Sequence, residues 1–159
     1  MSENLEIERK FLLKTLPIEI IHDDRIEIVQ HYFKTKNKWE RIRRSITNDN
    51  VIYHHTIKNS ISKGVCEEIE KEINDIEYQF YLNKCSKMIN KTRFIYNIDN
   101  NLKWEVDKYT HINLIVAEIE IPDINHKVKL PNWIKDRLIM EVTGIKEFSN
   151  RSLADKIEI

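Results

Sequence analysis

Apolar and polar side chains alternate with a period of two through most of the chain. The pattern is clearest in LEIERKFLL at residues 5–13, where the odd positions are apolar apart from Arg9, and the even positions Glu6, Glu8 and Lys10 are charged. This period is typical of a β-strand with one buried face. It predicts strands at about residues 4–13, 26–36, 38–47, 51–59, 64–74, 88–98, 101–109 and 113–122.

Three segments that lack the alternation are predicted to be helices, at residues 75–88, 131–138 and 149–157. In the first, Ile76, Phe80 and Leu82 fall at helical spacing, which indicates a helix packed on a sheet. The triplets NDN (48–50) and DNN (99–101) are turn signals between strands. Eight antiparallel strands with a few helices predict an α+β protein, one domain over residues 1–159, whose sheet can close on itself.

The predicted strands have a second shared feature, which is a charged face. Seven of the eight carry two charges, or a polar and a charged residue, two positions apart on one face. The signs are segregated by strand, which is unlike an ordinary soluble surface. The acidic members are Glu6, Glu8, Glu68, Glu70, Glu105, Asp107, Glu118 and Glu120, and the basic members are Lys10, Arg41, Arg43, Lys58, Lys91 and Arg93.

Two arrangements fit these faces. In one, they point to bulk water from a sheet whose other face is covered by helices. In the other, the sheet closes into a barrel with the charged faces inward and the helices packed outside. A dry interior could not hold so many ions, whereas a wet tunnel with a polyanionic ligand and divalent cations could. Periodicity alone leaves both arrangements open.

The composition narrows the classes of partner. The chain has 159 residues, 33% of them charged, with 26 Lys+Arg against 26 Asp+Glu. A neutral total argues against a general nucleic-acid or membrane-surface binder. The two cysteines, Cys66 and Cys85, have no metal-ligand spacing. The chain contains neither a P-loop nor a GxGxxG motif, so phosphate chemistry would have to use side chains.

The sequence shows no targeting signal and no membrane-spanning segment. The N-terminus MSENLEIERK is acidic and lacks the apolar core of a signal peptide. No apolar run approaches the roughly 20 residues that span a bilayer. We therefore expect a soluble, cytoplasmic protein, a monomer or homodimer, with no nucleic-acid or membrane partner.

The charged motifs, taken in order, resemble the CYTH domain, also called the triphosphate tunnel metalloenzyme family. LEIERKF is similar to the ExExK signature at the start of that domain, and further motifs follow in the family's order. These are RIR (41–43), TIK (56–58), EIE (68–70), KTR (91–93), WEVD (104–107), AEIE (117–120), EVTG (141–144) and SNRSLA (149–154). The likeness runs from about residue 3 to residue 155.

The resemblance implies an eight-stranded antiparallel tunnel with the charged side chains inside, a triphosphate-bearing small molecule as substrate, and Mg²⁺ or Mn²⁺. It implies metal ligation by Glu6, Glu8, Glu118 and Glu120. It implies phosphate binding by Lys10, Arg41, Arg43, Lys58, Lys91 and Arg93. Catalytic roles, which include holding a second cation or orienting water, would fall to Lys10, Glu68, Glu70, Glu105 and Asp107.

Two residues, Cys66 and Trp39, bear on how the substrate is bound. The fifth strand often reads RxExE in the family, and Cys66 stands at the Arg position, so one phosphate-side cation is missing. Trp39 shares the face of Arg41 and could stack on a base or on thiamine, although a packing role is the commoner one for such a residue.

The leading hypothesis is metal-dependent hydrolysis of inorganic triphosphate (tripolyphosphate) to pyrophosphate and phosphate. Phosphoryl transfer needs positioning and charge neutralisation more than covalent help, and the six cations and eight carboxylates would supply both. The alternatives within the family are a thiamine or nucleoside triphosphatase and a class IV adenylyl cyclase. Outside catalysis, the chain could be a polyphosphate- or nucleotide-binding module.

Overall fold

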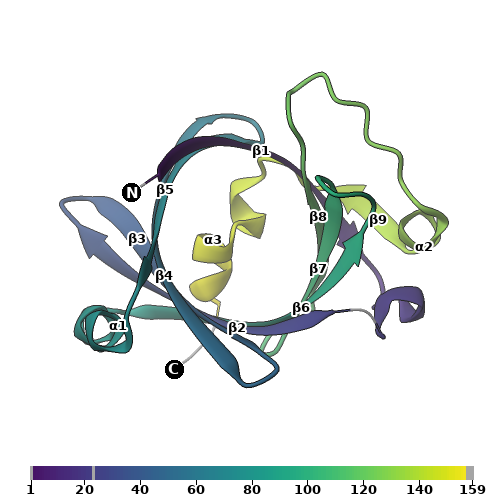
Figure 1. The fold of residues 1–159 in the computed structure, drawn as a ribbon. Coiled ribbons are helices and arrows are strands. Elements are labelled where there is room, and N and C mark those ends of the chain that lie inside the picture. The colour runs from purple at the N-terminus through teal and green to yellow at the C-terminus, as the bar shows by residue number, and fades with distance from the viewer. Residues whose placement is uncertain (1, 23, 157–159) are drawn as a thin grey trace.

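The computed structural model describes residues 2–22 and 24–156, and it is built mainly from antiparallel strands (Figure 1). In chain order these are β1 (Ser2–Leu13), β2 (Arg25–Thr35), β3 (Lys38–Thr47), β4 (Asn50–Ser62), β5 (Val65–Ile73), β6 (Lys87–Asn97), β7 (Lys103–Tyr109), β8 (Ile115–Glu120) and β9 (Leu138–Glu141). The helices are α1 (Asp75–Leu82), α2 (Asn132–Lys135) and α3 (Asn150–Ala154), with 3-10 turns at η1 (Ile18–Ile20) and η2 (Lys146–Phe148).

The first eight strands form a closed barrel, which confirms the predicted fold class. They pair in the order β5-β4-β3-β2-β6-β7-β8-β1, and β1 also pairs with β5 (Figure 1). Closure depends on the length of β1. Its residues 2–7 pair with β5 and its residues 8–13 pair with β8. The long alternating segment at the start of the chain is therefore the strand that joins the two ends of the sheet.

A ninth strand, β9, was not predicted. It pairs with residues 11–13 of β1, and its register shifts between Leu12 and Leu13. The sequence at 131–138 was predicted to be a helix, but α2 ends at Lys135 and the chain becomes extended at Leu138. Four residues are too few to show a period of two, so this strand has no signal of its own in the sequence.

The pairing registers bring the charged faces of neighbouring strands into rows. Arg41 lies opposite Thr56, and Thr56 lies opposite Glu70 on the next strand. Lys58 lies opposite Glu68, Arg93 opposite Asp107, and Lys10 opposite Glu118. Because alternate residues of a strand share a face, each row continues along the strands on the same side of the sheet.

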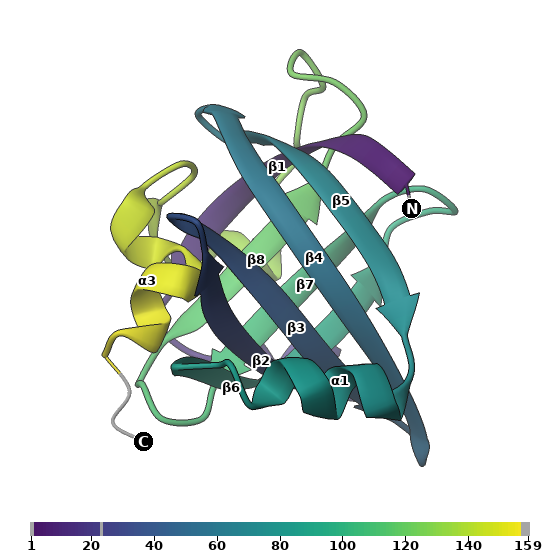
Figure 2. The ribbon, with the colours of Figure 1, turned by 90° about the vertical axis from the view of Figure 1, so that its left-hand side faces the viewer.

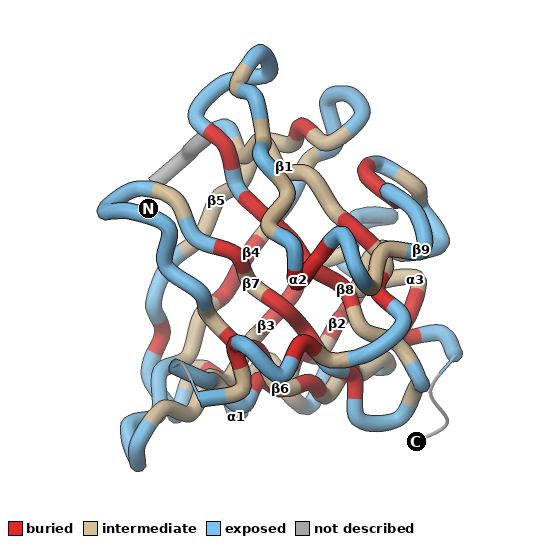
Figure 3. The backbone as a smooth tube through the Cα atoms, turned by 90° about the vertical axis from the view of Figure 1, so that its right-hand side faces the viewer, coloured by how far each residue is buried: buried red, intermediate tan, exposed pale blue. Residues whose placement is uncertain are grey.

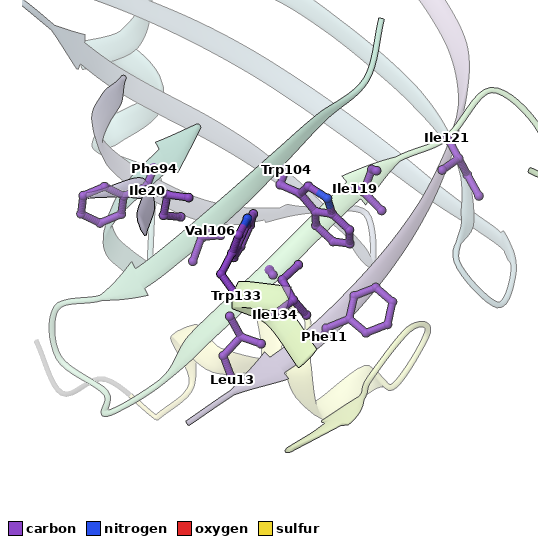
Figure 4. Packing of buried hydrophobic residues seen from close by; sticks show 11 residues of the cluster. Phe11, Leu13, Ile20, Phe94, Trp104, Val106, Ile119, Ile121, Trp133 and Ile134 are labelled. Carbon is purple, nitrogen blue, oxygen red and sulfur yellow. The ribbon is translucent and has the colours of Figure 1, made fainter. Parts of the chain in front are cut away.

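The hydrophobic core lies against the outer face of the barrel. Phe11, Trp104, Ile119 and Ile134 are buried between α2 and the strands β1, β7 and β8 (Figure 4). The Phe11 and Trp104 rings meet edge to face with 5.8 Å between their centroids. Burial is concentrated in the strands, and the hairpins are exposed (Figure 3). Since the apolar faces are used for this outer packing, the charged faces are left for the inside.

Helix α1 differs from its prediction in length and in orientation. It ends at Leu82 rather than at residue 88. Ile76 is 80% exposed and Phe80 is 59% exposed, while Tyr78 is buried against Phe33, Ile42 and Ile73. The face that packs is set by Tyr78, Tyr81 and Leu82, at spacings of three and four residues. The prediction placed Ile76 and Phe80 on the packed face together with Leu82, but in the structure Tyr78 and Tyr81 pack beside Leu82 in their place.

Helix α3 lies across one end of the barrel. Seen along the barrel axis it crosses the ring of strands, and the side view places it at one mouth (Figures 1 and 2). Ser149 caps it by accepting a hydrogen bond from the backbone N–H of Ser152. The helix predicted for 149–157 is confirmed as far as Ala154, and residue 157 lies outside the described residues.

Gly64, in the turn between β4 and β5, gives a test of this arrangement. Its φ is +74°, and a Cβ built there would lie 2.7 Å from the backbone oxygen of Glu8 and 2.8 Å from Cγ2 of Thr143. We expect Gly64→Ala to lower the free energy of unfolding by about 1–3 kcal/mol, because it adds left-handed strain to a clash with backbone. Urea denaturation measures the change.

The matched control for Gly64 is Ser62→Ala in the same turn region, at an exposed position, which should change the free energy of unfolding by less than about 0.5 kcal/mol. If Gly64→Ala were as stable as this control, the close approach of the β4–β5 turn to β1 would be contradicted.

Candidate active site

A cavity of about 1110 Å³ runs through the barrel. Of the fourteen charged residues singled out in the sequence, twelve line it: Glu6, Glu8, Lys10, Arg41, Arg43, Lys58, Glu68, Glu70, Arg93, Glu105, Glu118 and Glu120. They come from β1, β3, β4, β5, β6, β7 and β8, and β2 contributes the uncharged Tyr32 to the lining. The second of the two arrangements left open by the sequence, with charged faces inward, is the one that forms.

Glu6 and Glu68 form a hydrogen-bonded carboxyl pair on the wall where β1 meets β5. Lys58 Nζ lies 2.9 Å from Oε1 of Glu6 and 3.5 Å from Oε2 of Glu68. Burial tends to raise the pKa of Glu6, but its hydrogen bond with Glu68 and the charge of Lys58 outweigh this and lower the pKa to about 2. Burial and the same hydrogen bond raise the pKa of Glu68 to about 7. Of the two carboxyl groups, Glu6 is thus the one that the surroundings favour in its charged form, and Glu68 the one that they favour in its protonated form.

Glu8 and Glu118 face each other across Lys10. Lys10 Nζ lies 3.4 Å from Oε1 of Glu118 and 3.9 Å from Oε1 of Glu8. Burial and the nearby charge of Glu118 raise the pKa of Glu8 to about 8. For Glu118, burial is outweighed by Lys10, and the pKa is lowered. One lysine thus compensates only one of the two carboxylates, and the site has room for more positive charge.

The chemistry of these donors suits a hard divalent cation. Carboxylate oxygens are the ligands that Mg²⁺ and Mn²⁺ prefer, and a cation beside Glu8 would offset the charge of the neighbouring Glu118. Within residues 2–22 and 24–156, no three His, Cys, Asp or Glu side chains converge on one point to hold an ion. Glu8 and Glu118 point at Lys10 instead. The predicted metal ligands are carboxylates that lie near one another, so they fit a divalent cation. To bind it, the side chains of Glu8 and Glu118 would have to rotate away from Lys10.

The basic wall is formed by three guanidinium groups. Arg43 donates from Nε (3.0 Å) and from Nη2 (2.7 Å) to Oε1 of Gln30, which is fully buried. Burial and the positive charges of Arg41 and Arg93 lower the pKa of Arg43 to about 9, so the group stays charged at neutral pH. Like charges crowded in this way lower the free energy of binding an anion between them.

Arg41 has one donor without a partner. Its Nη2 donates to Oγ1 of Thr56 (3.1 Å) and contacts Oε2 of Glu70 (3.4 Å). Thr56 in turn donates to the same Glu70 oxygen at 2.8 Å. The Nε of Arg41 is buried and has no hydrogen-bond partner in the described structure. A buried donor of this kind is costly unless it is used by a ligand.

Lys91 and Asp107 are the two predicted residues that do not line the cavity. Both side chains are completely buried in the wall, with 2.7 Å between Nζ and Oδ2. Asp107 also accepts two hydrogen bonds from Arg93, at 2.7 Å and 2.9 Å. In this structure neither side chain lines the cavity, so their direct contact with phosphate or water stays a prediction. The carboxylate fixes the guanidinium of Arg93, whose Nη1 also donates to Glu105 at 3.1 Å.

Lys91, Arg93, Asp107, Tyr109 and Asn150 form a hydrogen-bonded group in the barrel wall, here called the wall cluster. Tyr109 and Asn150 were not predicted to belong to the site. Oδ1 of Asn150 accepts hydrogen bonds from the hydroxyl of Tyr109 and from Nζ of Lys91, the latter at 3.4 Å. Burial lowers the pKa of Lys91 to about 7, although Asp107 acts in the opposite direction. Asn150 belongs to the SNRSLA motif, and this was the only signal for it, because 59 residues separate it from Lys91.

Cys66 occupies the wall where the family pattern often has arginine. Its Sγ lies 3.6 Å from Oε1 of Glu6, and burial raises the pKa of the thiol to about 12. The residue is therefore a neutral thiol at physiological pH, and it adds no positive charge to this part of the cavity. The consequence for phosphate binding stays a prediction.

The segment after β9 completes the cavity. Its lining residues are Val142, Thr143, Gly144, Ile145, Lys146, Ser149, Asn150 and Arg151. Thr143 accepts a hydrogen bond from the backbone N–H of Lys10 (2.9 Å) and donates one to Glu141 (2.7 Å). This anchors the EVTG segment to β1 and brings α3 to the mouth of the barrel.

A barrel of eight antiparallel strands around an internal wall of opposed acidic and basic side chains defines a class of tunnel proteins. The model of the CYTH domain matches residues 4–154. An inorganic triphosphatase of Acetivibrio thermocellus is 33% identical over 153 residues, which cover 93% of this chain and 92% of that protein. The chain belongs to the CYTH domain family.

Solved structures agree on the fold. The inorganic triphosphatase NE1496 aligns with a TM-score of 0.62 and 24% identity, covering 97% of each chain. The PH1819 protein of Pyrococcus horikoshii OT3 aligns with a TM-score of 0.59 and 21% identity over 82% of each chain. A putative adenylyl cyclase of Hippeastrum, described as having a dominant triphosphatase activity, aligns with a TM-score of 0.53 and 17% identity over 74% of this chain and 80% of its own.

Among the described helices, none has both the length and the apolar character needed to span a bilayer.

Proposed function

We propose that the protein hydrolyses inorganic triphosphate to pyrophosphate and phosphate with the help of a divalent cation. The observation that carries this proposal is the cavity itself, in which buried guanidinium and ammonium groups face clustered carboxylates. A polyanion with bound cations matches both walls at once. The inorganic triphosphatase of Acetivibrio thermocellus supports the same substrate class.

The basic wall holds the phosphate chain in this proposal. Arg41, Arg43 and Arg93 line the cavity, and each is fixed by a neighbour: Thr56, Gln30 and Asp107 respectively. Fixed guanidinium groups bind phosphate oxygens without losing side-chain freedom. Lys10 and Lys58 extend the cationic contacts onto the acidic side, where each already lies between two carboxylates.

The acidic wall holds the cation. The proposed ligands are Glu8 and Glu118, with Glu6 and Glu120 beside them. When bound, Mg²⁺ or Mn²⁺ would neutralise charge on the phosphate oxygens and lower the pKa of water. Lys10 lies beside both of the carboxylates that would hold the cation, and its ammonium group would contact a phosphate oxygen next to that site.

In the chemical step a water oxygen bonds to a terminal phosphorus. The P–O bond to the middle phosphate breaks, and pyrophosphate leaves with the bonding electron pair. A carboxylate on the acidic wall takes the proton of the water. We assign this role to Glu68, a cavity-lining carboxylate whose ion pair in the described structure is with Lys58 rather than with a guanidinium group. Glu70 is held by Arg41 and Thr56, and Glu105 by Arg93.

The experiment that tests the proposal is a phosphate-release assay on purified protein. Tripolyphosphate, ATP and thiamine triphosphate are compared at equal concentration with Mg²⁺, with Mn²⁺ and with a chelator. We expect tripolyphosphate to be turned over at least about tenfold faster than the other two, with one phosphate and one pyrophosphate formed per substrate, and no turnover in chelator.

Each alternative function has its own outcome in this assay. Faster turnover of ATP or thiamine triphosphate would replace the proposed substrate with an organic triphosphate. Cyclic AMP on chromatography would indicate a cyclase. Binding of tripolyphosphate, measured by calorimetry, without any turnover would indicate a binding module.

A further inference from the structure

The cavity offers little aromatic surface to an organic group on a triphosphate. Of the described residues that line it, Tyr32 and Trp39 are the aromatic ones. Tyr32 is only 6% exposed, and its hydroxyl accepts a hydrogen bond from Gln30 at 2.8 Å. A nucleobase or a thiazolium ring gains affinity by stacking on an open aromatic face. Trp39 is therefore the residue that decides whether such a group is held.

The face of Trp39 is already covered. The guanidinium carbon of Arg151 lies over the indole ring, 3.7 Å from its centroid. This is stacking distance, so a planar ring could reach the same face only after the guanidinium had moved away. Lys34, the cross-strand neighbour of Trp39, has its Nζ at 5.7 Å from the ring, which is too far to cover it.

Arg151 is held in this position by Asp155 and by the packing of α3. Its Nη1 donates to Oδ1 of Asp155 at 2.9 Å, and the same oxygen lies 3.2 Å from Nζ of Lys87. Its Nε is buried and has no hydrogen-bond partner in the described structure. Leu153 and Ala154 of the same helix are buried against the barrel. The cover is thus fastened by packing and by ion pairs.

We propose that Arg151 determines substrate specificity by covering Trp39, so that the cavity accepts bare phosphate chains and disfavours nucleoside triphosphates. The inference rests on the proposed function for its substrate class and goes beyond it by assigning the residue that sets the selectivity. A neighbouring cavity that shares Lys103, Glu105 and Glu120 with this one has no phenylalanine, tyrosine or tryptophan among its described lining residues. An organic group that extended there would find no such ring to stack on either.

Calorimetric binding of the non-hydrolysable ATP analogue AMPPNP with Mg²⁺ tests the inference without any turnover. We expect Arg151→Ala to bind AMPPNP about tenfold more tightly than the unchanged protein. Removing a positive charge should by itself weaken the binding of an anion, so a gain is opposite in sign to the electrostatic effect. Pyrophosphate, which has no ring, should bind Arg151→Ala with unchanged or slightly lower affinity.

Two controls separate the cover from general effects. Lys34→Ala removes a cation near Trp39 without uncovering the stacked face, and its AMPPNP affinity should stay within about twofold of the unchanged protein. The double variant Trp39→Ala/Arg151→Ala should lose the gain. If Arg151→Ala does not fold by circular dichroism, Asp155→Asn loosens the guanidinium instead and should give a gain of about threefold.

The inference would be overturned if folded Arg151→Ala or Asp155→Asn bound AMPPNP no more tightly than the unchanged protein. It would also be overturned if the double variant Trp39→Ala/Arg151→Ala kept the gain in affinity. Failure of the proposed function is a different result, namely no hydrolysis of tripolyphosphate by the unchanged protein. The binding measurement gives its answer in either case, because it requires no turnover.

Discussion

Glu8→Gln is expected to lower the metal-dependent kcat/KM for tripolyphosphate by at least about 100-fold. Glu8 lies in the part of the cavity where two carboxylates, Glu8 and Glu118, share one lysine, so a divalent cation there would meet two carboxylate ligands. The glutamine keeps the size of the side chain and one oxygen, but it removes the negative charge that would hold a divalent cation. Steady-state assays over a range of Mg²⁺ and Mn²⁺ concentrations measure the loss.

The matched control is Glu72→Gln. Glu72 shares a strand face with Glu68 and Glu70 in β5, but it is exposed and is not among the described residues that line the cavity. Its replacement should change kcat/KM by less than about twofold. Turnover of Glu8→Gln at the level of this control, with the same metal dependence, would refute the ligand role of Glu8.

Asp107→Asn should lower the free energy of unfolding by about 3–5 kcal/mol at pH 7. The carboxylate lies at 0% exposure between Lys91 and Arg93, with contacts of 2.7 Å to each. Its replacement leaves the buried guanidinium of Arg93 without its nearest anion and the buried amine of Lys91 without its acceptor, which is the costly way to break a buried ion pair. Urea denaturation of the two proteins gives the difference.

The same pair of proteins should also differ in their dependence on pH. Arg93 and Lys91 hold the pKa of Asp107 well below its usual range, against the effect of burial. The stability that Asp107 supplies is therefore complete above about pH 4, where the unfolded chain is also ionised, and it is lost as the pH falls through the folded value. The advantage of the unchanged protein over Asp107→Asn should shrink below about pH 4.

Glu105→Gln is the matched control, because Glu105 also contacts Arg93, at 3.1 Å, but its side chain is 21% exposed. Solvent screens this pair, so the loss should stay below about 1 kcal/mol. An Asp107→Asn variant as stable as Glu105→Gln, or a stability gap that widens in acid, would contradict the account of the wall cluster.

The strands and the charged set could be predicted from the sequence, because each depends on a local period of two. The side of the sheet that the set faces could not, since an alternating strand reads the same with either face inward. The resemblance to the CYTH domain pointed to the inner face, and the barrel closure by β1 gives it a structural basis.

The alternating pattern also could not predict which residues of a charged strand face line the cavity and which are buried in the wall. Lys91 and Arg93 share a strand face, yet Arg93 lines the cavity while Lys91 is enclosed by Asp107 and Asn150. The difference comes from α3, whose packing at the barrel mouth depends on contacts between residues far apart in the chain. The cover of Trp39 by Arg151 was hidden for the same reason.

The central claim is that one cavity holds the phosphate chain on its basic wall and a divalent cation on its acidic wall. A crystal structure of the protein soaked with tripolyphosphate and Mn²⁺, with anomalous scattering used to locate the metal, tests it most directly. We predict phosphate density within hydrogen-bond distance of Arg41, Arg43 and Arg93, and Mn²⁺ bound to Glu8 and Glu118. Phosphate density confined to the outer surface of the barrel, with no Mn²⁺ at these carboxylates, would contradict the claim.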